Sequence, residues 1–198
     1  MTGAILAGGM SRRMGFNKAL LKLNNETIIE RTVRLFKEVF DETVIVANDP
    51  LLYEDLSTRI VTDIYKGAGS MGGIYTALFH CAPDNCYVFV AACDMPNLNK
   101  DAIQAVIKNA DKKFDAVIPF VSGRAHPMHG LYSKGCLKPI ESMIRQGNLK
   151  ISELLDKIRV KKLTEDDLKG IPIASSVENI NTQEDLKRLA NMVDADKK

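Results

Sequence analysis

The sequence has no long apolar run, no excess of one charge and no cysteines spaced C-x-x-C. No apolar run approaches the roughly 20 residues that cross a bilayer, and no charged segment precedes an apolar core, so we expect neither a membrane span nor a secretory signal. The 27 basic and 25 acidic residues leave a net charge of +2, too balanced for a nucleic-acid surface. Cys81, Cys86, Cys93 and Cys136 fit reduced packing residues of a cytoplasmic protein better than disulfides or a metal site.

What is present is an alternation of strand-like and helical segments along 198 residues. This length suits one α/β domain, and the alternation favours a mostly parallel sheet with helices on both faces. Apolar runs predict strands at 4–6, 43–47, 59–62, 87–92, 116–121 and 160–163, the last at an edge of the sheet. Helical patterns span 27–40, 74–81, 101–110, 136–146, 151–158 and 182–192, and 126–133 reads as extended.

The first strand-like run leads into a loop rich in glycines and cations. Gly8 and Gly9 let the backbone come close to a ligand. Backbone N–H groups together with Arg12, Arg13 and Lys18 supply the positive charge that a polyphosphate requires. Lys18 is not followed by the Ser or Thr of a Walker A loop. We therefore expect a nucleotide-binding loop of another kind; the alternative is a tight turn with a solvated basic loop.

A single carboxylate, Asp94, directly follows the central strand-like run 87–92. Magnesium takes one or two carboxylates and completes its shell with water and phosphate oxygens. Parallel strands would place this carboxylate at the same sheet edge as the basic first loop. We expect Asp94 to hold Mg²⁺ beside a triphosphate; the alternative is a turn or helix cap.

Two other motifs have competing interpretations. Gly67, Gly69 and Gly72 match G-x-G-x-x-G and allow an NAD(P)-binding oxidoreductase. Residues 64–66, however, stand between Asp63 and the first glycine, whereas the fingerprint turn starts at the strand end. A loop that closes over a ligand is the alternative. His126 and His129 have the spacing of a helical metal pair, but Pro127 disfavours a helix, so polar packing or a place along a substrate groove is expected.

Three ordered motifs give the sequence a family resemblance. They are Leu-Ala-Gly-Gly-x-Ser-x-Arg-Met-Gly-x-x-Lys at 6–18, Cys-Asp-Met-Pro at 93–96 and Asn-Ile-Asn-Thr-x-Glu-Asp-Leu at 179–186. Together they resemble the molybdenum cofactor guanylyltransferases over nearly the whole chain, and the segment 126–131 is also similar. Relatives that transfer cytidylate usually carry Leu-Ala-Ala-Gly, so Gly8 favours guanine. At 69–73 the family more often has Gly-Pro-Leu-Ala-Gly, so contacts of this loop are not carried over.

The resemblance implies a Rossmann-like nucleotidyltransferase that joins GMP from GTP to the terminal phosphate of molybdenum-molybdopterin and releases pyrophosphate. It implies Mg²⁺ on Asp94. From the charges of the first loop and of this carboxylate we expect catalytic roles for Lys18, Arg12 and Asp94. By similarity, the GTP-binding residues are Leu6, Ala7, Gly8, Lys18, Asn48, Asp63 and Asp94, and the molybdopterin-side residues are Asn179 and Asn181. From the loop itself we add Gly9 and Arg13 to the expected GTP-binding residues. Whether Asp63 contacts guanine or ribose stays open.

The expected organisation is one domain over 1–198, with a nucleotide-binding part at about 1–100, an acceptor part at about 101–193 and a charged tail at 194–198. We expect a cytoplasmic monomer without nucleic-acid or membrane partners. The resemblance alone implies contacts with a molybdenum insertase and with molybdoenzyme chaperones. The alternatives are CTP transfer to molybdopterin, nucleotide transfer to a sugar phosphate, and a nucleotide sensor without activity.

Overall fold

The computed structural model describes residues 1–8, 17–23, 25–83, 87–180 and 185. Within these residues the central sheet contains β1 (Thr2–Leu6), β4 (Glu42–Val46), β5 (Arg59–Val61), β6 (Tyr87–Ala92), β7 (Ala116–Val121), β8 (Arg124–Ala125), β9 (His129–Ser133) and β10 (Val160–Leu163). A separate hairpin pairs β2 (Lys22–Leu23) with β3 (Glu26–Thr27). The expected strands are confirmed, with their ends shifted by no more than two residues.

The central sheet is mixed and mostly parallel. Its order is β10-β7-β9-β6-β1-β4-β5, with β8 paired to β7. Parallel pairing joins β1 to β4 and β6, β4 to β5, and β7 to β10. The strand β9 runs antiparallel between β6 and β7, and β10 lies at an edge, as predicted.

The register of the parallel strands aligns four strand ends. Leu6 of β1 lies opposite Val46 of β4 and also opposite Ala92 of β6. Val46 in turn lies opposite Val61 of β5. The loops that follow these four residues therefore leave the sheet along one edge, which is where open α/β sheets bind ligands.

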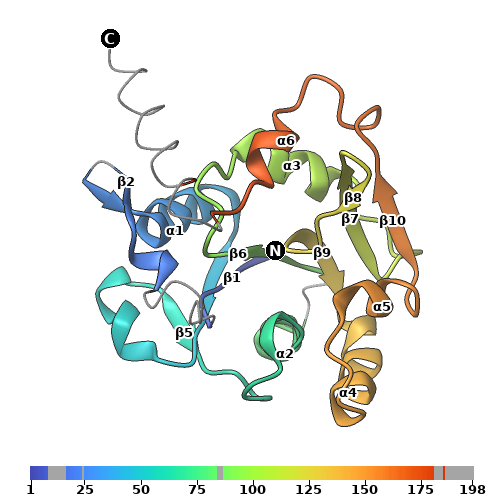
Figure 1. Ribbon diagram of the computed structural model, residues 1–198, viewed down its shortest axis with the longest axis horizontal. Coiled ribbons are helices and arrows are strands. Elements are labelled where there is room, and N and C mark those ends of the chain that lie inside the picture. Colours follow the sequence, from blue (N-terminus) through green and yellow to red (C-terminus); the bar gives the residue numbers. More distant parts are fainter. Residues whose placement is uncertain (9–16, 24, 84–86, 181–184, 186–198) are drawn as a thin grey trace.

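Helices cover both faces of the sheet and produce the expected three layers (Figure 1). On one face pack α1 (Ile28–Val39), α3 (Lys100–Lys108) and α6 (Ile173–Ser176). On the other pack α2 (Gly69–His80), α4 (Leu137–Arg145) and α5 (Ile151–Leu155). Short 3₁₀ turns, η1 (Lys18–Leu20), η2 (Pro50–Leu56) and η3 (Lys134–Cys136), occupy connections. No helix within the described part of the chain is long and apolar enough to cross a bilayer.

The helix α2 begins earlier than the sequence pattern indicated. A start at Ile74 was expected, but the helix begins at Gly69 and contains Gly72 and Gly73. A Cβ on Gly72 would lie 2.8 Å from the Tyr65 carbonyl oxygen, and one on Gly73 would lie 2.8 Å from Leu6 Cδ1. These glycines therefore lower helix propensity but allow the first turn to pack closely on β1.

The second half of the chain differs from the expectations in its turns. The segment 126–133 becomes a strand only at His129, because 126–128 form a turn in which the His129 N–H bonds the His126 carbonyl. The helix expected over 151–158 ends at Leu155. The helix expected over 182–192 lies outside the described residues, apart from position 185.

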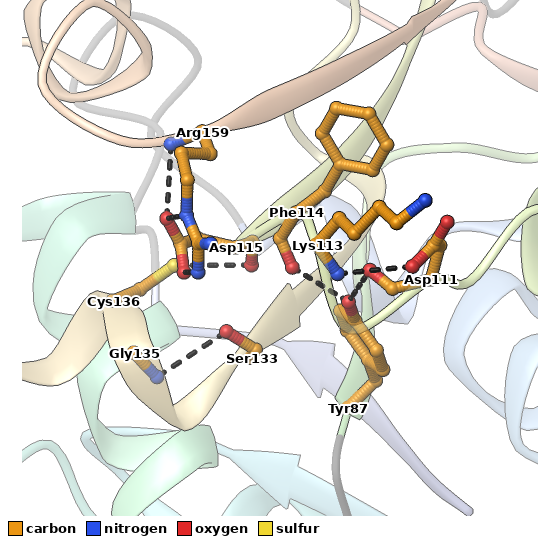
Figure 2. Close-up of polar contacts among 9 residues, drawn as sticks. All are labelled: Tyr87, Asp111, Lys113, Phe114, Asp115, Ser133, Gly135, Cys136 and Arg159. Carbon is orange, nitrogen blue, oxygen red and sulfur yellow. Dashed lines mark hydrogen bonds and ion pairs between the residues drawn. The ribbon is translucent and has the colours of Figure 1, made fainter.

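Polar contacts join chain segments distant in sequence at the end of the sheet opposite the aligned strand ends Leu6, Val46, Val61 and Ala92 (Figure 2). The Arg159 guanidinium donates to both oxygens of Asp115, at 2.8 and 3.0 Å. The Asp115 carbonyl accepts from the Ser133 N–H at 2.7 Å. The Tyr87 hydroxyl lies 2.6 Å from the Phe114 carbonyl oxygen. These contacts join the starts of β6, β7 and β10 to the end of β9, away from the edge described above.

The cysteines described are packing residues, as expected. Cys81, Cys93 and Cys136 are free and buried. Burial raises the pKa of Cys93 and of Cys136 to about 12, so both stay as neutral thiols. Cys86 lies outside the described residues.

Candidate active site at the carboxyl edge of the sheet

Each of the four aligned strands is followed by a residue that the sequence marked as a binding position. Gly8, Asn48, Asp63 and Asp94 each stand two positions beyond the aligned strand ends. All four line one cavity of about 620 Å³. Its other described lining residues are Leu6, Lys18, Val46, Gly67, Gly69, Ser70, Gly73, Ala92, Cys93, Met128 and Asn179. The strand register therefore brings distant parts of the chain into one site.

The charged centre of this cavity is an ion pair between Lys18 and Asp94. The Lys18 Nζ lies 3.3 Å from Asp94 Oδ2, and the side chains are only 13% and 21% exposed. Lys18 also donates to the backbone carbonyl of Ile180. The Asp94 carbonyl accepts from the Ile180 N–H at 2.9 Å. A cation and a carboxylate are thus held together on the wall of the cavity, where a phosphate and a metal ion are expected to bind.

Two residues that the sequence analysis missed hold the segment carrying Lys18. The Asn17 side chain caps η1 by accepting from the Ala19 N–H at 3.0 Å, and its Nδ2 donates to the Tyr53 hydroxyl at 2.6 Å. The buried Tyr53 hydroxyl donates to the Ala7 carbonyl at 3.3 Å. The Asn17 position has a sequence signal, because Asn is a preferred N-cap. Tyr53 has none, because its role depends on a contact between segments 36 residues apart.

Asp63 is the most unusual carboxyl group of the cavity. It is 7% exposed, and its Oδ1 is buried without a hydrogen-bond partner among the described residues. Burial raises the pKa of Asp63, while hydrogen bonds from Asn48 and Thr76 act in the opposite direction. A buried carboxylate oxygen without a donor is costly. This one lines the cavity, so a ligand N–H or O–H group could supply the missing donor.

Gly8 lies against the same two polar side chains. Its carbonyl accepts from Asn48 Nδ2 at 3.3 Å. A Cβ at this position would lie 3.1 Å from Asn48 Nδ2 and 3.2 Å from Asp63 Oδ2. Glycine therefore permits a close approach that even alanine would disturb.

The glycine-rich loop also lines the cavity, but not in the manner of a dinucleotide fingerprint. Gly67 and Gly69 have positive φ angles of 81° and 57°. The helix begins at Gly69, in the middle of the motif, and Gly72 packs on the Tyr65 carbonyl. In the fingerprint the first glycine forms the turn at the strand end, whereas Gly67 here follows β5 after five intervening residues. This geometry disfavours the interpretation of the motif as the NAD(P)-binding site of an oxidoreductase.

The residues present fit a magnesium ion that arrives with a polyphosphate. Asp94 is one accessible carboxylate on the cavity wall. No cluster of three or more His, Cys, Asp or Glu side chains suited to a metal occurs among the described residues. Magnesium commonly uses one or two carboxylates and takes its other ligands from water and substrate phosphates. The donor set therefore suits an ion shared with a nucleotide.

The two histidines of the middle segment have different surroundings. His129 is fully buried, its Nε2 lies 2.9 Å from Ser176 Oγ, and its ring meets Phe89 edge-on. Burial lowers the pKa of His129 to about 4. Burial also lowers the pKa of His126. Met128 rather than either histidine is among the described cavity-lining residues, so the expectation of polar packing is confirmed for His129.

The structure brings together most of the described residues that the sequence pointed to. Leu6, Gly8, Lys18, Asn48, Asp63, Asp94 and Asn179 all line the cavity. Ala7 is buried behind it and bonds to Val46 and Tyr53. Gly9, Arg12, Arg13 and Asn181 lie outside the described residues.

Comparison with known proteins agrees with this geometry. The family model of the MobA-like NTP transferase domain matches residues 3–162. A molybdenum cofactor guanylyltransferase of Desulfosudis oleivorans is 37% identical over 95% of this chain and 93% of its own length. A probable molybdenum cofactor guanylyltransferase of Natranaerobius thermophilus is 36% identical over 95% of this chain and 94% of its own.

Comparison with solved structures shows that the chain is similar to these proteins in fold as well as in sequence. The crystal structure of molybdopterin-guanine dinucleotide biosynthesis protein A from Archaeoglobus fulgidus has a TM-score of 0.85 and 31% identity, covering 98% of this chain and 100% of that one. A 4-diphosphocytidyl-2C-methyl-D-erythritol synthase from Anaerococcus prevotii, at 17% identity and a TM-score of 0.73, covers 98% of this chain and 95% of that one and shares the fold. The sequence resemblance is confirmed: this chain belongs to the MobA-like NTP transferase family and, within it, to the molybdenum cofactor guanylyltransferases.

Proposed function

We propose that this enzyme transfers GMP from GTP to the terminal phosphate of molybdenum-molybdopterin, giving molybdopterin guanine dinucleotide and pyrophosphate. The observation that carries the proposal is the Lys18–Asp94 ion pair in the same cavity as Asn48 and the buried Asp63. A triphosphate needs the cation, its metal ion needs the carboxylate, and a nucleoside needs polar groups that accept its donors. The names of the relatives support the choice of guanylate and of molybdopterin.

The reaction suits a site whose described lining residues supply charge but include no histidine that could act as a catalytic base. A phosphate monoester has its second pKa near 6 and is largely dianionic at neutral pH, so the acceptor is already a nucleophile. The protein must bring two anions together and stabilise the departing pyrophosphate, which it does by positioning and electrostatics. We assign the ammonium of Lys18 to the β- and γ-phosphates and propose the same role for Arg12 and Arg13, which lie outside the described residues.

Asp94 would hold Mg²⁺, which when bound would neutralise phosphate charge and polarise the phosphorus–oxygen bonds. The carboxylate is held in place by Lys18 and by its position directly after β6. The one-carboxylate site supports an ion bound together with GTP rather than a resident metal.

The remaining roles follow the arrangement of the cavity. Leu6, Ala7, Gly8 and Gly9 would bring backbone groups against the nucleotide, and Asn48 and Asp63 would contact the nucleoside. Asp63 Oδ1, buried without a donor among the described residues, supports acceptance from guanine N–H groups or from a ribose hydroxyl. Asn179 lines the cavity and, with Asn181, is assigned to the molybdopterin side.

Pyrophosphate release tests the proposal. With GTP, Mg²⁺ and molybdopterin the enzyme should release pyrophosphate, and omission of any one should abolish release. CTP, UTP or ATP should support release at least tenfold less well, and each should displace a labelled guanine nucleotide poorly. Preference for CTP, or a sugar phosphate as the better acceptor, would replace the proposal with the corresponding transferase. GTP binding without turnover would instead support a nucleotide sensor.

The wider assignments stay predictions. These are the division into a nucleotide part near 1–100 and an acceptor part near 101–193, the monomeric state and the cytoplasmic location. The contacts with a molybdenum insertase and with molybdoenzyme chaperones also stay predictions.

A further inference from the structure

Ile180 has an unusual set of neighbours for an aliphatic residue. It lies next to Asn179, which lines the cavity, and its own side chain is fully buried. It belongs to neither of the two large cores on the faces of the sheet. Instead, it forms a small separate cluster with Leu23 and Ile28, against which Leu21 packs. Among the described residues, the Ile180 side chain is therefore anchored by this small cluster and not by either large core.

This small cluster flanks the segment that carries Lys18. Leu21 and Leu23 follow η1 directly, and Ile28 begins α1. The Ile28 N–H donates to the Leu21 carbonyl at 2.9 Å, which ties the helix start to the same segment. A shift of the Ile180 side chain would therefore displace the residues that directly follow η1, the turn that begins with Lys18.

The backbone of Ile180 contacts both partners of the central ion pair. Its N–H donates to the Asp94 carbonyl at 2.9 Å, and its carbonyl accepts from Lys18 Nζ. The Lys18 ammonium is thus held between the Asp94 carboxylate and the Ile180 carbonyl. A fixed ammonium loses less conformational freedom when it binds phosphate, because its four-carbon chain is already ordered.

The segment before Ile180 is anchored as well. Ser176 Oγ accepts from the Asn99 N–H at 3.0 Å and lies 2.9 Å from His129 Nε2. Both Ser176 and His129 are fully buried. The stretch from Ser176 to Ile180 is therefore fixed at both ends, with Asn179 between them.

We propose that Ile180 is a positioning residue that holds Lys18 against Asp94 and so joins the acceptor side of the cavity to its nucleotide side. The inference rests on the proposed role of Lys18 in binding the triphosphate. The competing interpretation is that Ile180 only contributes buried apolar contacts. Ile140 of α4 is such a residue: it is equally buried, but it packs in the core between the sheet and the helices α2, α4 and α5.

A double-mutant cycle separates the two roles, because groups that act through one another are not additive. The affinity for GTP with Mg²⁺ is measured by calorimetry for wild type, Lys18→Ala, Ile180→Ala and the double variant. We expect Ile180→Ala to weaken binding about tenfold in the wild-type background and less than about twofold in the Lys18→Ala background. Ile180→Val, which refills most of the volume, should restore most of the affinity. The control Ile140→Ala should lower Tm but leave the affinity unchanged.

Amide hydrogen exchange gives a second measurement that needs no nucleotide. If Ile180 and Lys18 hold one another, Lys18→Ala should speed exchange of the Ile180 N–H about tenfold or more. Ile140→Ala should speed it much less. Absence of GTP binding by wild type would count against the proposed function alone. An equal effect of Ile180→Ala in both backgrounds, or an Ile180 amide insensitive to Lys18→Ala, would overturn the positioning role.

Discussion

The Lys18 ammonium lies 3.3 Å from the Asp94 carboxylate although 76 positions separate the two residues in the chain. The contact follows from strand register, because β1 pairs in parallel with β6 and Leu6 lies opposite Ala92. The loops after these strands therefore leave the sheet side by side, one bringing a cation and the other a carboxylate. The proposed phosphate and metal sites both depend on this pair.

Replacement of Asp94 by alanine should lower kcat about a thousandfold or more, because a metal clamp is worth several kcal/mol and about 1.4 kcal/mol corresponds to tenfold. The fold should persist, because the Asp94 carbonyl and not its side chain bonds Ile180. Steady-state pyrophosphate release measures kcat, and circular dichroism checks the fold. Asp166→Ala, at an exposed position, is the control. Near-normal turnover of Asp94→Ala with Mg²⁺ would exclude the metal role.

Replacement of Lys18 by alanine should weaken GTP binding roughly 100-fold and GDP binding distinctly less, because the ammonium is assigned to the β- and γ-phosphates and a charged hydrogen bond contributes about 1.5–3 kcal/mol. Calorimetry with both nucleotides measures the difference. An equal loss for GTP and GDP would move Lys18 to the α-phosphate or the base.

Asp63→Asn should weaken GTP binding roughly tenfold to 100-fold at pH 7, if the carboxylate accepts from the nucleotide. Burial raises the pKa of Asp63 above its ordinary 3.8, so the carboxylate is lost as the pH falls through this raised value. Wild-type affinity should therefore begin to fall at a higher pH than for an ordinary aspartate, and the Asn variant should lack this component. Calorimetry at a series of pH values from about 4, near the ordinary aspartate pKa, up to about 8 measures it.

The same shift predicts an effect on folding with the opposite sign. Because the native state binds a proton at Asp63 more readily than the unfolded chain does, ionisation destabilises the fold as the pH rises through the raised pKa. Asp63→Asn should consequently raise Tm at neutral pH while it weakens GTP binding. A variant that loses both stability and affinity would argue that Asp63 is only structural.

Asp115→Asn should lower the free energy of unfolding by about 1 kcal/mol at pH 7, since it removes a two-bond contact with a mostly exposed arginine. The hydrogen bonds from Arg159 lower the pKa of Asp115 below 3.8. Its stabilisation is therefore present above that pH and is lost as the pH falls through the lowered pKa.

Urea denaturation at pH 7 and pH 3 measures this change. Lys100→Ala, which removes the exposed pair with Glu38, should change stability by less than about 0.5 kcal/mol. Nucleotide affinity of Asp115→Asn should match wild type, because the pair precedes β7 and β10, at the other end of the strands from Asp94, and neither partner is among the described cavity-lining residues. A loss of affinity would contradict the separation of the two regions.

The sheet and most of the site could be predicted from the sequence because their signals are local. Apolar runs such as 87–92 predict strands by themselves, and Asp94 stands directly after one of them. Parallel topology then brings strand ends to a common edge without knowledge of side-chain packing.

What the sequence could not reveal depends on contacts between distant segments. The early start of α2 follows from close packing of Gly73 on Leu6, which overrides helix propensity. Tyr53 stands in no recognisable motif, and in the motif that contains Ile180 only the asparagines were assigned a role. The positions of both residues beside Ala7 and Lys18 arise only in the folded chain.

The most direct test of the central claim follows the α-phosphate of GTP. The enzyme is incubated with α-labelled GTP, Mg²⁺ and molybdopterin, and the label is located after separation of the products. We expect the label in molybdopterin guanine dinucleotide with wild type, and its transfer there to be about a thousandfold or more slower with Asp94→Ala. Label that stays in GTP with wild type, or reaches the dinucleotide equally fast with Asp94→Ala, would contradict the account.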